Sequence, residues 1–165
     1  MTRIMRDSTT PTDIPIDGTD LAAGYINGQF KWSPEGFARF PEAKHVHIDV
    51  DGTNPEGAGV VDCETGDVTV PGAVKWAKAR KAAHPGEYPP IIYCNRSTLT
   101  PLFNAMNAAG LHIVKDFRLW IATLDGTKTV PDMTGVTAVQ YAGESMTGGH
   151  FDESIVHDDH WHAHG

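Results

Sequence analysis

The sequence predicts a single-domain α/β protein, an incomplete TIM-like barrel of the (β/α)5(β)3 type. Candidate strands alternate with candidate helices over the first two-thirds of the chain, which is typical of parallel βαβ units. The last third contains strand patterns without long helices between them. A full (β/α)8 barrel needs about 250 residues, so a chain of 165 residues accommodates eight strands only by dropping helices.

The first elements are two strands and a short helix. Residues 2–9 form a strand that ends in polar residues, and residues 21–28 form a strand that ends at a glycine. Ser33-Pro34, followed by Phe37 and Phe40, predicts a short helix within residues 30–41.

Residues 43–53 alternate strictly, as a strand does. Val46, Ile48 and Val50 lie on one face, and His45, His47 and Asp49 lie on the other. The next strand, residues 57–64, ends at a Gly-Asp turn signal.

The remaining elements follow from helical spacing and from helix-ending residues. Val70, Val74 and Ala77 recur at helical spacing within residues 69–86, and Pro85-Gly86 ends that helix. A proline near the start and a glycine at the end indicate a second helix at 99–110. Strands are expected at 88–97, 117–124, 136–143 and 148–156. The barrel domain thus spans residues 1–156, and residues 157–165 form a His-rich tail.

Composition excludes several functional classes. The net charge is −8, and the 13 Lys and Arg residues are scattered, whereas a nucleic-acid partner requires a basic stripe. No apolar run reaches the roughly 18 residues of a membrane span, so we expect no membrane insertion. The N-terminal segment lacks the apolar stretch of about 7–15 residues of a signal peptide, and we expect release to the cell wall by another route.

Cysteine and histidine patterns give no strong metal signal. Cys63 and Cys94 are too few for a disulfide framework and lack zinc-type spacing. Buried free thiols are the favoured state, although a bridge between neighbouring strands stays open. The tail histidines have a loose spacing at a chain end; they are His157, His160, His162 and His164. We therefore expect no metal and no cofactor.

Asp62 and Glu64 form the most informative pair of acids. Residues two apart in a strand point to the same face, so both carboxyls address one substrate while Cys63 points away. Reactive residues of α/β barrels lie at the C-terminal strand ends, where Asp7 is also expected. Two carboxyls in different surroundings, one protonated and one charged, are what glycoside hydrolysis uses.

The order of several short motifs resembles glycoside hydrolase family 25, the Chalaropsis-type lysozymes or muramidases. These motifs are "DS" closing the first strand, "VVDCE" at the fourth strand end, then "LWIA", "AVQY" and "FDES". The resemblance covers nearly the whole chain and implies an incomplete barrel of five βα units followed by three strands.

The resemblance also implies roles for individual residues. Glu64 would be the proton donor, and Asp62 would assist the substrate's acetamido group or stabilise the cation. Asp7 and Asp152 match two further acids of the cleft, although "FDES" leaves Glu153 as a competitor of Asp152. Segments that line the sugar cleft match three more residues, namely Trp120, Gln140 and Tyr141.

Other residues compete for places in the cleft. Asp49 is the strongest rival acid, and His47 on the same face could join it. Asp51 is explained as a turn residue. Tyr25 and Tyr93, near strand ends, are further candidates for sugar contacts, whereas Trp32 and Trp76 are expected in the core.

Two functions of different class remain. The first is a muramidase that cleaves the β-1,4 bond of peptidoglycan strands without metal or cofactor, for instance an endolysin encoded by a phage. The second is a non-catalytic module on the same fold, which binds a glycan or takes a structural place on a virion surface beside other virion proteins.

Overall fold

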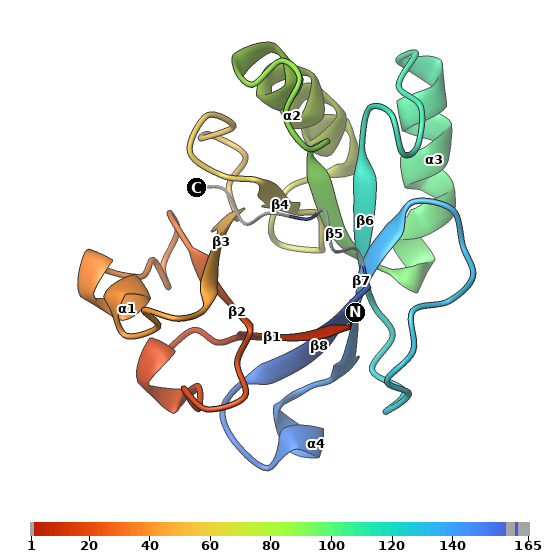
Figure 1. Cartoon of the computed structure of the whole chain (residues 1–165). Helices are drawn as coiled ribbons and strands as arrows, with labels where there is room; N and C mark the ends of the chain where they lie inside the picture. Colours follow the sequence, from red (N-terminus) through yellow and green to blue (C-terminus); the bar gives the residue numbers. More distant parts are fainter. Residues whose placement is uncertain (1, 158–160, 162–165) are drawn as a thin grey trace.

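Eight strands form one closed barrel in the order of the sequence (Figure 1). The computed structural model describes residues 2–157 and residue 161. The strands are β1 (Arg3–Asp7), β2 (Leu21–Tyr25), β3 (Lys44–Asp49), β4 (Val60–Asp62), β5 (Ile91–Asn95), β6 (Arg118–Ala122), β7 (Val136–Ala142) and β8 (Asp152–Val156). The predicted barrel, with its eight strands, is therefore confirmed.

Four α-helices lie in the connections: α1 (Pro34–Ala38), α2 (Val70–Ala83), α3 (Leu99–Ala108) and α4 (Glu144–Thr147). The side chains of Ser33 and Thr69 cap α1 and α2 by accepting hydrogen bonds from backbone N–H groups, which is the usual role of these residues at helix starts. The β1–β2 connection holds only a short 3₁₀ helix, η1 (Pro11–Asp13), and the β3–β4 connection has no assigned helix. Fewer of the first five strands are thus followed by an α-helix than a (β/α)5 arrangement implies.

The last strand closes the barrel in the opposite direction. Neighbours from β1 to β7 pair in parallel, but β8 pairs antiparallel with both β7 and β1. A parallel partner for β7 requires a crossover of a dozen or more residues, and residues 143–151 are too few. The direction of β8 therefore follows from the short connection that precedes it.

The barrel separates two apolar layers. Side chains inside the barrel include Met5, Leu21, Ile48, Ile91 and Trp120, and they fill its lower part. A second cluster packs between the outer wall and helices α2 and α3, which flank β4 to β6 in Figure 1. The described helices lack the length and apolarity that crossing a bilayer takes.

The two cysteines and one tryptophan of the C-terminal tail lie in these layers. Cys63 and Cys94 are free thiols in the outer layer, and burial raises the pKa of Cys63 to about 11 and that of Cys94 to about 12. Such thiols are unreactive at neutral pH. Trp161 lies inside the barrel, where its ring is 6.3 Å from that of Trp120. The tail residues His160, His162 and His164 lie outside the described residues.

Asp49 organises the β3–β4 connection from the outer face of the barrel. Its side chain is fully buried. One carboxylate oxygen accepts hydrogen bonds from the backbone N–H groups of Asp51 (3.2 Å) and Gly52 (2.7 Å) and from Asn27 Nδ2 (2.7 Å). The other accepts from the Asn54 N–H (2.7 Å) and from Trp76 Nε1 (2.8 Å).

These hydrogen bonds decide the charge state of Asp49. Burial alone would raise the pKa of this carboxyl, but the hydrogen bonds from Asn27, Asn54 and Trp76 outweigh it and lower the pKa. A carboxylate with a lowered pKa stabilises the fold above the pKa of the unfolded chain, and this contribution disappears in acid. Asp49 is thus a structural anion of the loop.

We expect Asp49→Asn to lower the free energy of unfolding by about 2–4 kcal/mol at pH 7, because its amide group would point a donor at other donors. The loss should shrink towards pH 3, because the unfolded chain begins to bind a proton at Asp49 near pH 4, while the lowered pKa keeps the folded carboxylate ionised to lower pH. Urea unfolding at both pH values measures it. Asp132→Asn is the matched control, since Asp132 is exposed and lies outside this loop, and an equal effect of both substitutions would contradict this role of Asp49.

Candidate active site

A pocket of about 320 Å³ opens at the C-terminal ends of the parallel strands. Four of the residues that line it are acidic, three are aromatic and one is aliphatic. They are Asp7, Asp62, Glu64, Asp152, Tyr25, Tyr93, Trp120 and Ile48. The pocket therefore brings together all four acids expected to be catalytic and three of the residues expected to contact the substrate.

Strand register brings the acids together. Asp7 ends β1 and is the direct partner of Asp152, the first residue of antiparallel β8. Asp62 ends β4 and pairs with Tyr93 of β5. The inner face of the barrel therefore carries Asp7, Asp62 and Asp152 in one layer, above the apolar filling.

A tight turn after β4 adds a fifth acid. Gly66 has a φ of +94°, a conformation that glycine adopts without strain. The turn is closed by hydrogen bonds from the Asp67 N–H to the Glu64 carbonyl (3.1 Å) and from the Val68 N–H to the Asp62 carbonyl (3.0 Å). Carboxylate oxygens of Asp62, Glu64 and Asp67 consequently lie within 4.8 Å of one another.

Crowding and burial shift the charge of the Asp62–Glu64 pair. Burial raises the pKa of Asp62 to about 9, with further contributions from the negative charges of Glu64 and Asp67. Burial also raises the pKa of Glu64, although a hydrogen bond from Asp62 opposes this rise. The direction of that hydrogen bond makes Asp62 the protonated partner, so the two carboxyls hold one proton between them at neutral pH.

The two acids of the β1–β8 pair are affected in the same direction. Burial raises the pKa of Asp7 well above its ordinary value, and the charges of Asp152 and Glu64 add to this effect. Burial likewise raises the pKa of Asp152, followed by the charge of Glu144. Asp7 Oδ1 and Asp62 Oδ1 are buried without a hydrogen-bond partner, which is a costly state for a carboxylate. The pocket therefore favours proton-bearing carboxyls.

Aromatic side chains form the remaining wall. The Tyr93 hydroxyl donates to Gln140 Oε1 (2.5 Å), and the Tyr93 ring meets Trp120 edge-on at 4.8 Å. Trp120 Nε1 donates to Ser154 Oγ (3.0 Å). Gln140 in turn hydrogen-bonds Asp152 and opposes the rise of its pKa. Gln140 thus supports two pocket residues from β7.

Three residues considered for the cleft lie elsewhere. Asp49 is on the outer face of β3, where the hydrogen bonds described above use both of its oxygens, and His47 beside it contacts Phe37 (ring centroids 4.7 Å). Tyr141 also points outward, and its hydroxyl donates to Glu153. Alternation along β3 and β7 explains these positions, because Ile48 and Gln140 occupy the inward places.

The sequence does not predict that Ile48 lines the pocket or that Asp67 lines the groove beside it. The sequence indicates only that Asp67 is the second residue of a Gly-Asp turn. No sequence pattern shows that the backbone reverses at Gly66 and brings Asp67 close to Asp62. Ile48 reads only as an apolar strand residue. A wider groove of about 650 Å³ continues from the pocket and shares Tyr25, Asp62 and Glu64 with it. Its further lining residues are Thr9, Asn27, Gln29, Phe30, Val50 and Asp67.

Metal binding has one candidate position among the described residues. The oxygens of Asp62, Glu64 and Asp67 are spaced closely enough for one divalent cation to contact all three, and carboxylate oxygens are ligands that Ca²⁺ and Mg²⁺ prefer. The same spacing also explains the mutual repulsion that raises the pKa values of Asp62 and Glu64.

Comparison with solved structures identifies the architecture. The chain superposes on a family 25 glycosyl hydrolase from Bacillus anthracis with a TM-score of 0.58 at 13% identity, covering 95% of this chain and 89% of the other. A muramidase from Acremonium alcalophilum gives 0.58 at 15% identity, with 96% and 94% covered. A bacterial lysozyme from Streptomyces coelicolor gives 0.54 at 16% identity, with 94% and 92% covered.

The chain has the fold of the family 25 glycosyl hydrolases. The resemblance inferred from the sequence motifs is confirmed at this level, over nearly the full length of the barrel. No protein-family model matches the sequence, and no curated protein sequence matches it.

The raised pKa of Asp62 predicts how the free energy of unfolding depends on pH. The folded state keeps the Asp62 proton up to about pH 9, whereas the unfolded chain releases it near pH 4. Stability is therefore lost as the pH rises between these values. We expect Asp62→Asn to raise the free energy of unfolding by roughly 1–2 kcal/mol at pH 8 and to have little effect at pH 4.

Chemical unfolding of both proteins across this pH range measures the gain. Asp132→Asn is the control, because Asp132 is an exposed aspartate that does not line the pocket. A gain that does not depend on pH would contradict the assignment of a raised pKa to Asp62.

Proposed function

We propose that the chain is a muramidase that hydrolyses the β-1,4 bond after N-acetylmuramic acid in peptidoglycan. The observation that carries the proposal is the Asp62–Glu64 pair, which shares one proton in a desolvated pocket at the C-terminal end of the barrel. The fold supports it, because a muramidase and a lysozyme have the same architecture.

The two carboxyls would divide the work by their exposure. Glu64 lines the pocket and the wider groove and is half-buried, whereas Asp62 is only 6% exposed. Glu64 is therefore the acid that reaches a glycosidic oxygen, and the hydrogen bond from Asp62 supplies the shared proton to it. Proton transfer to the leaving oxygen breaks the bond to the anomeric carbon.

Negative charge then appears where the sugar becomes positive. After the proton leaves, both carboxyls of the pair are ionised beside an oxocarbenium-like centre, and Asp7 and Asp152 face the same space. Ionisation of crowded, buried carboxyls is unfavourable in the empty pocket and favourable beside a cation. Water finally adds to the anomeric carbon and returns a proton to the pair.

The separation of the pair supports retention of configuration. Carboxylate oxygens of Asp62 and Glu64 lie within 4.8 Å, whereas inverting glycosidases keep their carboxyls about 6.5–9.5 Å apart to hold a water molecule between them. Asp62 would then stabilise the cation directly or assist the neighbouring acetamido group of the substrate.

Replacing the proposed proton donor tests the function. We expect Glu64→Gln to lower the release of reducing ends from purified cell walls by at least about 100-fold, because the amide has no proton to give. Glu56→Gln, which alters an exposed glutamate outside the pocket, should keep the wild-type rate. Equal rates for Glu64→Gln and wild type would refute the role of Glu64.

The same assay separates the enzyme from a non-catalytic module. Binding of the wild-type protein to purified glycan strands without release of reducing ends would favour a glycan-binding role. A place on a virion, or release to the wall as an endolysin, stays a prediction from the sequence.

Asp67 provides a pH-dependent test of the pair. Its charge raises the pKa values of Asp62 and Glu64, so Asp67→Asn should lower both. The alkaline limb of the activity profile should move to lower pH, by roughly half a unit. Asp132→Asn removes the same charge from an exposed site and should leave the limb in place. A limb that moves to higher pH, or does not move, would count against this electrostatic coupling.

A further inference from the structure

The seam between β1 and β8 carries a polar network on its outer face, directly behind two pocket acids. The antiparallel register pairs Arg6 with Glu153 and, one residue along, Asp7 with Asp152. Because successive side chains alternate between the faces of a sheet, the first pair points outward and the second points into the pocket. Each inner acid is thus covalently adjacent to a member of the outer pair.

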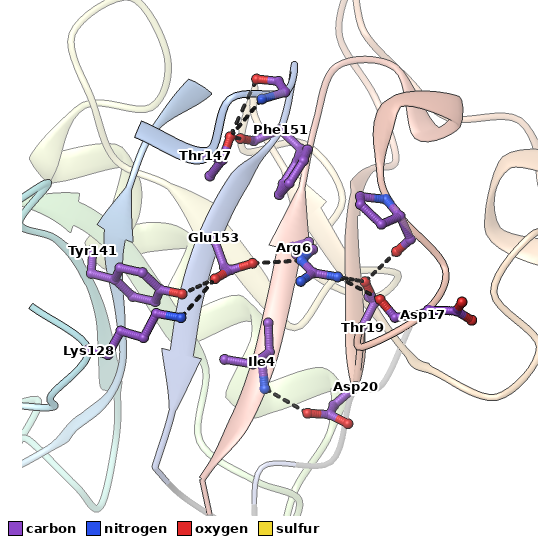
Figure 2. A network of polar contacts seen from close by, with 12 residues as sticks. Ile4, Arg6, Asp17, Thr19, Asp20, Lys128, Tyr141, Thr147, Phe151 and Glu153 are labelled. Atoms are coloured by element: carbon purple, nitrogen blue, oxygen red, sulfur yellow. Dashed lines mark hydrogen bonds and ion pairs between the residues drawn. The ribbon is translucent and has the colours of Figure 1, made fainter. Parts of the chain in front are cut away.

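Arg6 links both strands to the β1–β2 connection (Figure 2). Its Nε donates to Glu153 Oε2 at 2.7 Å. Its Nη1 donates to the Asp17 carbonyl (3.0 Å) and to Thr19 Oγ1 (2.9 Å). The guanidinium lies 5.5 Å from the Phe151 ring centroid, and the side chains of Arg6 and Glu153 are only 15% and 13% exposed. The pair is therefore largely shielded from water.

Glu153 extends the network to β7. Its second oxygen accepts a hydrogen bond from the Tyr141 hydroxyl, and Lys128 Nζ lies 3.6 Å from the same oxygen. Burial alone would raise the pKa of Glu153, but the hydrogen bonds from Tyr141 and Arg6 outweigh it and lower the pKa. Glu153 of β8 is therefore ionised at neutral pH, and its hydrogen bonds link β8 to β7 through Tyr141 and to β1 through Arg6.

Tyr141 lies at a β-bulge in the pairing of β7 with β8. Gln140 pairs with Ser154, but Ala142 pairs with Glu153, so Tyr141 is the additional residue on β7. Such bulges re-aim side chains at barrel rims. Alternation with the inward-facing Gln140 already turns Tyr141 outward. At the bulge the Tyr141 hydroxyl donates to Glu153, while Gln140 keeps its inward contact with Tyr93.

Repulsion between the inner acids, Asp7 and Asp152, acts against the strand register that the outer pair, Arg6 and Glu153, stabilises. Asp7 and Asp152 are two acids in one buried pocket. Burial raises both pKa values, and ionising both acids would place like charges side by side without water. Moving β8 by one residue against β1 would send Asp152 to the outer face and bring Glu153 inside, so Asp7 would lose its acidic partner and Arg6 its ion pair. Attraction between the outer residues therefore opposes the slip that repulsion between the inner acids promotes.

We propose that Arg6, Glu153 and Tyr141 are positioning residues of the active site, which hold β1 and β8 in the register that faces Asp7 towards Asp152. This inference rests on the proposed function for its catalytic consequence. The positioning itself is a property of the fold that can be measured without substrate.

The inner acids face several other ionisable groups that must be kept constant. Asp7 faces Asp62 and Glu64 from β4 and the turn after it, Tyr25 from β2, and Tyr93 from β5. Asp152 additionally feels Glu144 of α4 and hydrogen-bonds Gln140 of β7. None of these groups is altered in the experiment below.

The decisive variant is the charge-neutral double substitution Arg6→Gln/Glu153→Gln. Removing the positive charge of Arg6 alone would raise the pKa values of the inner acids, and removing the negative charge of Glu153 alone would lower them. The double substitution therefore cancels the direct electrostatic effects. Loss of register would instead lower both titration midpoints, because the acids would separate and gain water. We expect falls of about one pH unit and an approximately tenfold lower kcat with little change in KM.

Carboxyl carbon NMR measures the midpoints, with signals assigned from Asp7→Asn and Asp152→Asn spectra. The single substitution Arg6→Lys keeps the positive charge beside Glu153, so this variant should retain the wild-type midpoints and kcat. Asp116→Asn is the matched control. It removes a buried carboxylate that lies outside the paired residues of β1 and β8 and binds Lys81. It should lower stability and leave the midpoints unchanged.

The outcomes separate the possibilities. Unchanged midpoints in a folded double variant would overturn the proposal and reduce the network to a stabilising role. If the double variant does not fold, Tyr141→Phe removes only a hydroxyl and must lower the midpoints in the same direction, or the proposal fails. Lowered midpoints in a protein whose wild type releases no reducing ends would support the positioning role and refute the proposed function.

Discussion

Closure of the barrel leaves each strand residue two places to point, inward or outward, and the chemistry of the pocket follows from this constraint. The lower interior is filled by apolar side chains such as Leu21, Ile91 and Trp120. Water therefore does not reach Asp7 or Asp62 from below, and both carboxyls lose solvation at the top of the barrel. Burial is the largest cause of the raised pKa of each, so the apolar filling creates the reactive charge state above it.

Asp49 and Asp62 show how the two faces treat the same side chain. Both end a strand and both are buried. On the outer face Asp49 receives five hydrogen bonds and stays ionised, which stabilises the loop. On the inner face Asp62 Oδ1 has no hydrogen-bond partner, and the carboxyl holds its proton at the expense of stability. The wall of the barrel thus separates a structural acid from a reactive one.

The sequence was sufficient for the eight strands, for the helices α1 to α3 and for the closest pair of acids, because these depend on local spacing. It did not predict the short helices η1 and α4. Alternation along residues 43–53 sorts Val46 and Ile48 from Asp49, but the pattern does not state which face closes inward. The pairing of β7 with β6 and β8 decides that Gln140 rather than Tyr141 faces inward, and the return of Asp67 depends on the φ of Gly66. Such features arise from pairing between distant strands or from a single backbone torsion, and neither leaves a periodic trace.

The connections without an α-helix explain how a short chain keeps the register of eight strands. In the β1–β2 connection, Arg6 binds Asp17 and Thr19, and the Ile4 N–H donates to Asp20 (Figure 2). In the β3–β4 connection, the backbone N–H groups converge on Asp49. A packed helix holds strands by broad apolar contact that tolerates small shifts, whereas hydrogen bonds weaken steeply with distance and angle. Replacing helices by these directional contacts shortens the chain and fixes β1, which carries Asp7, and β3.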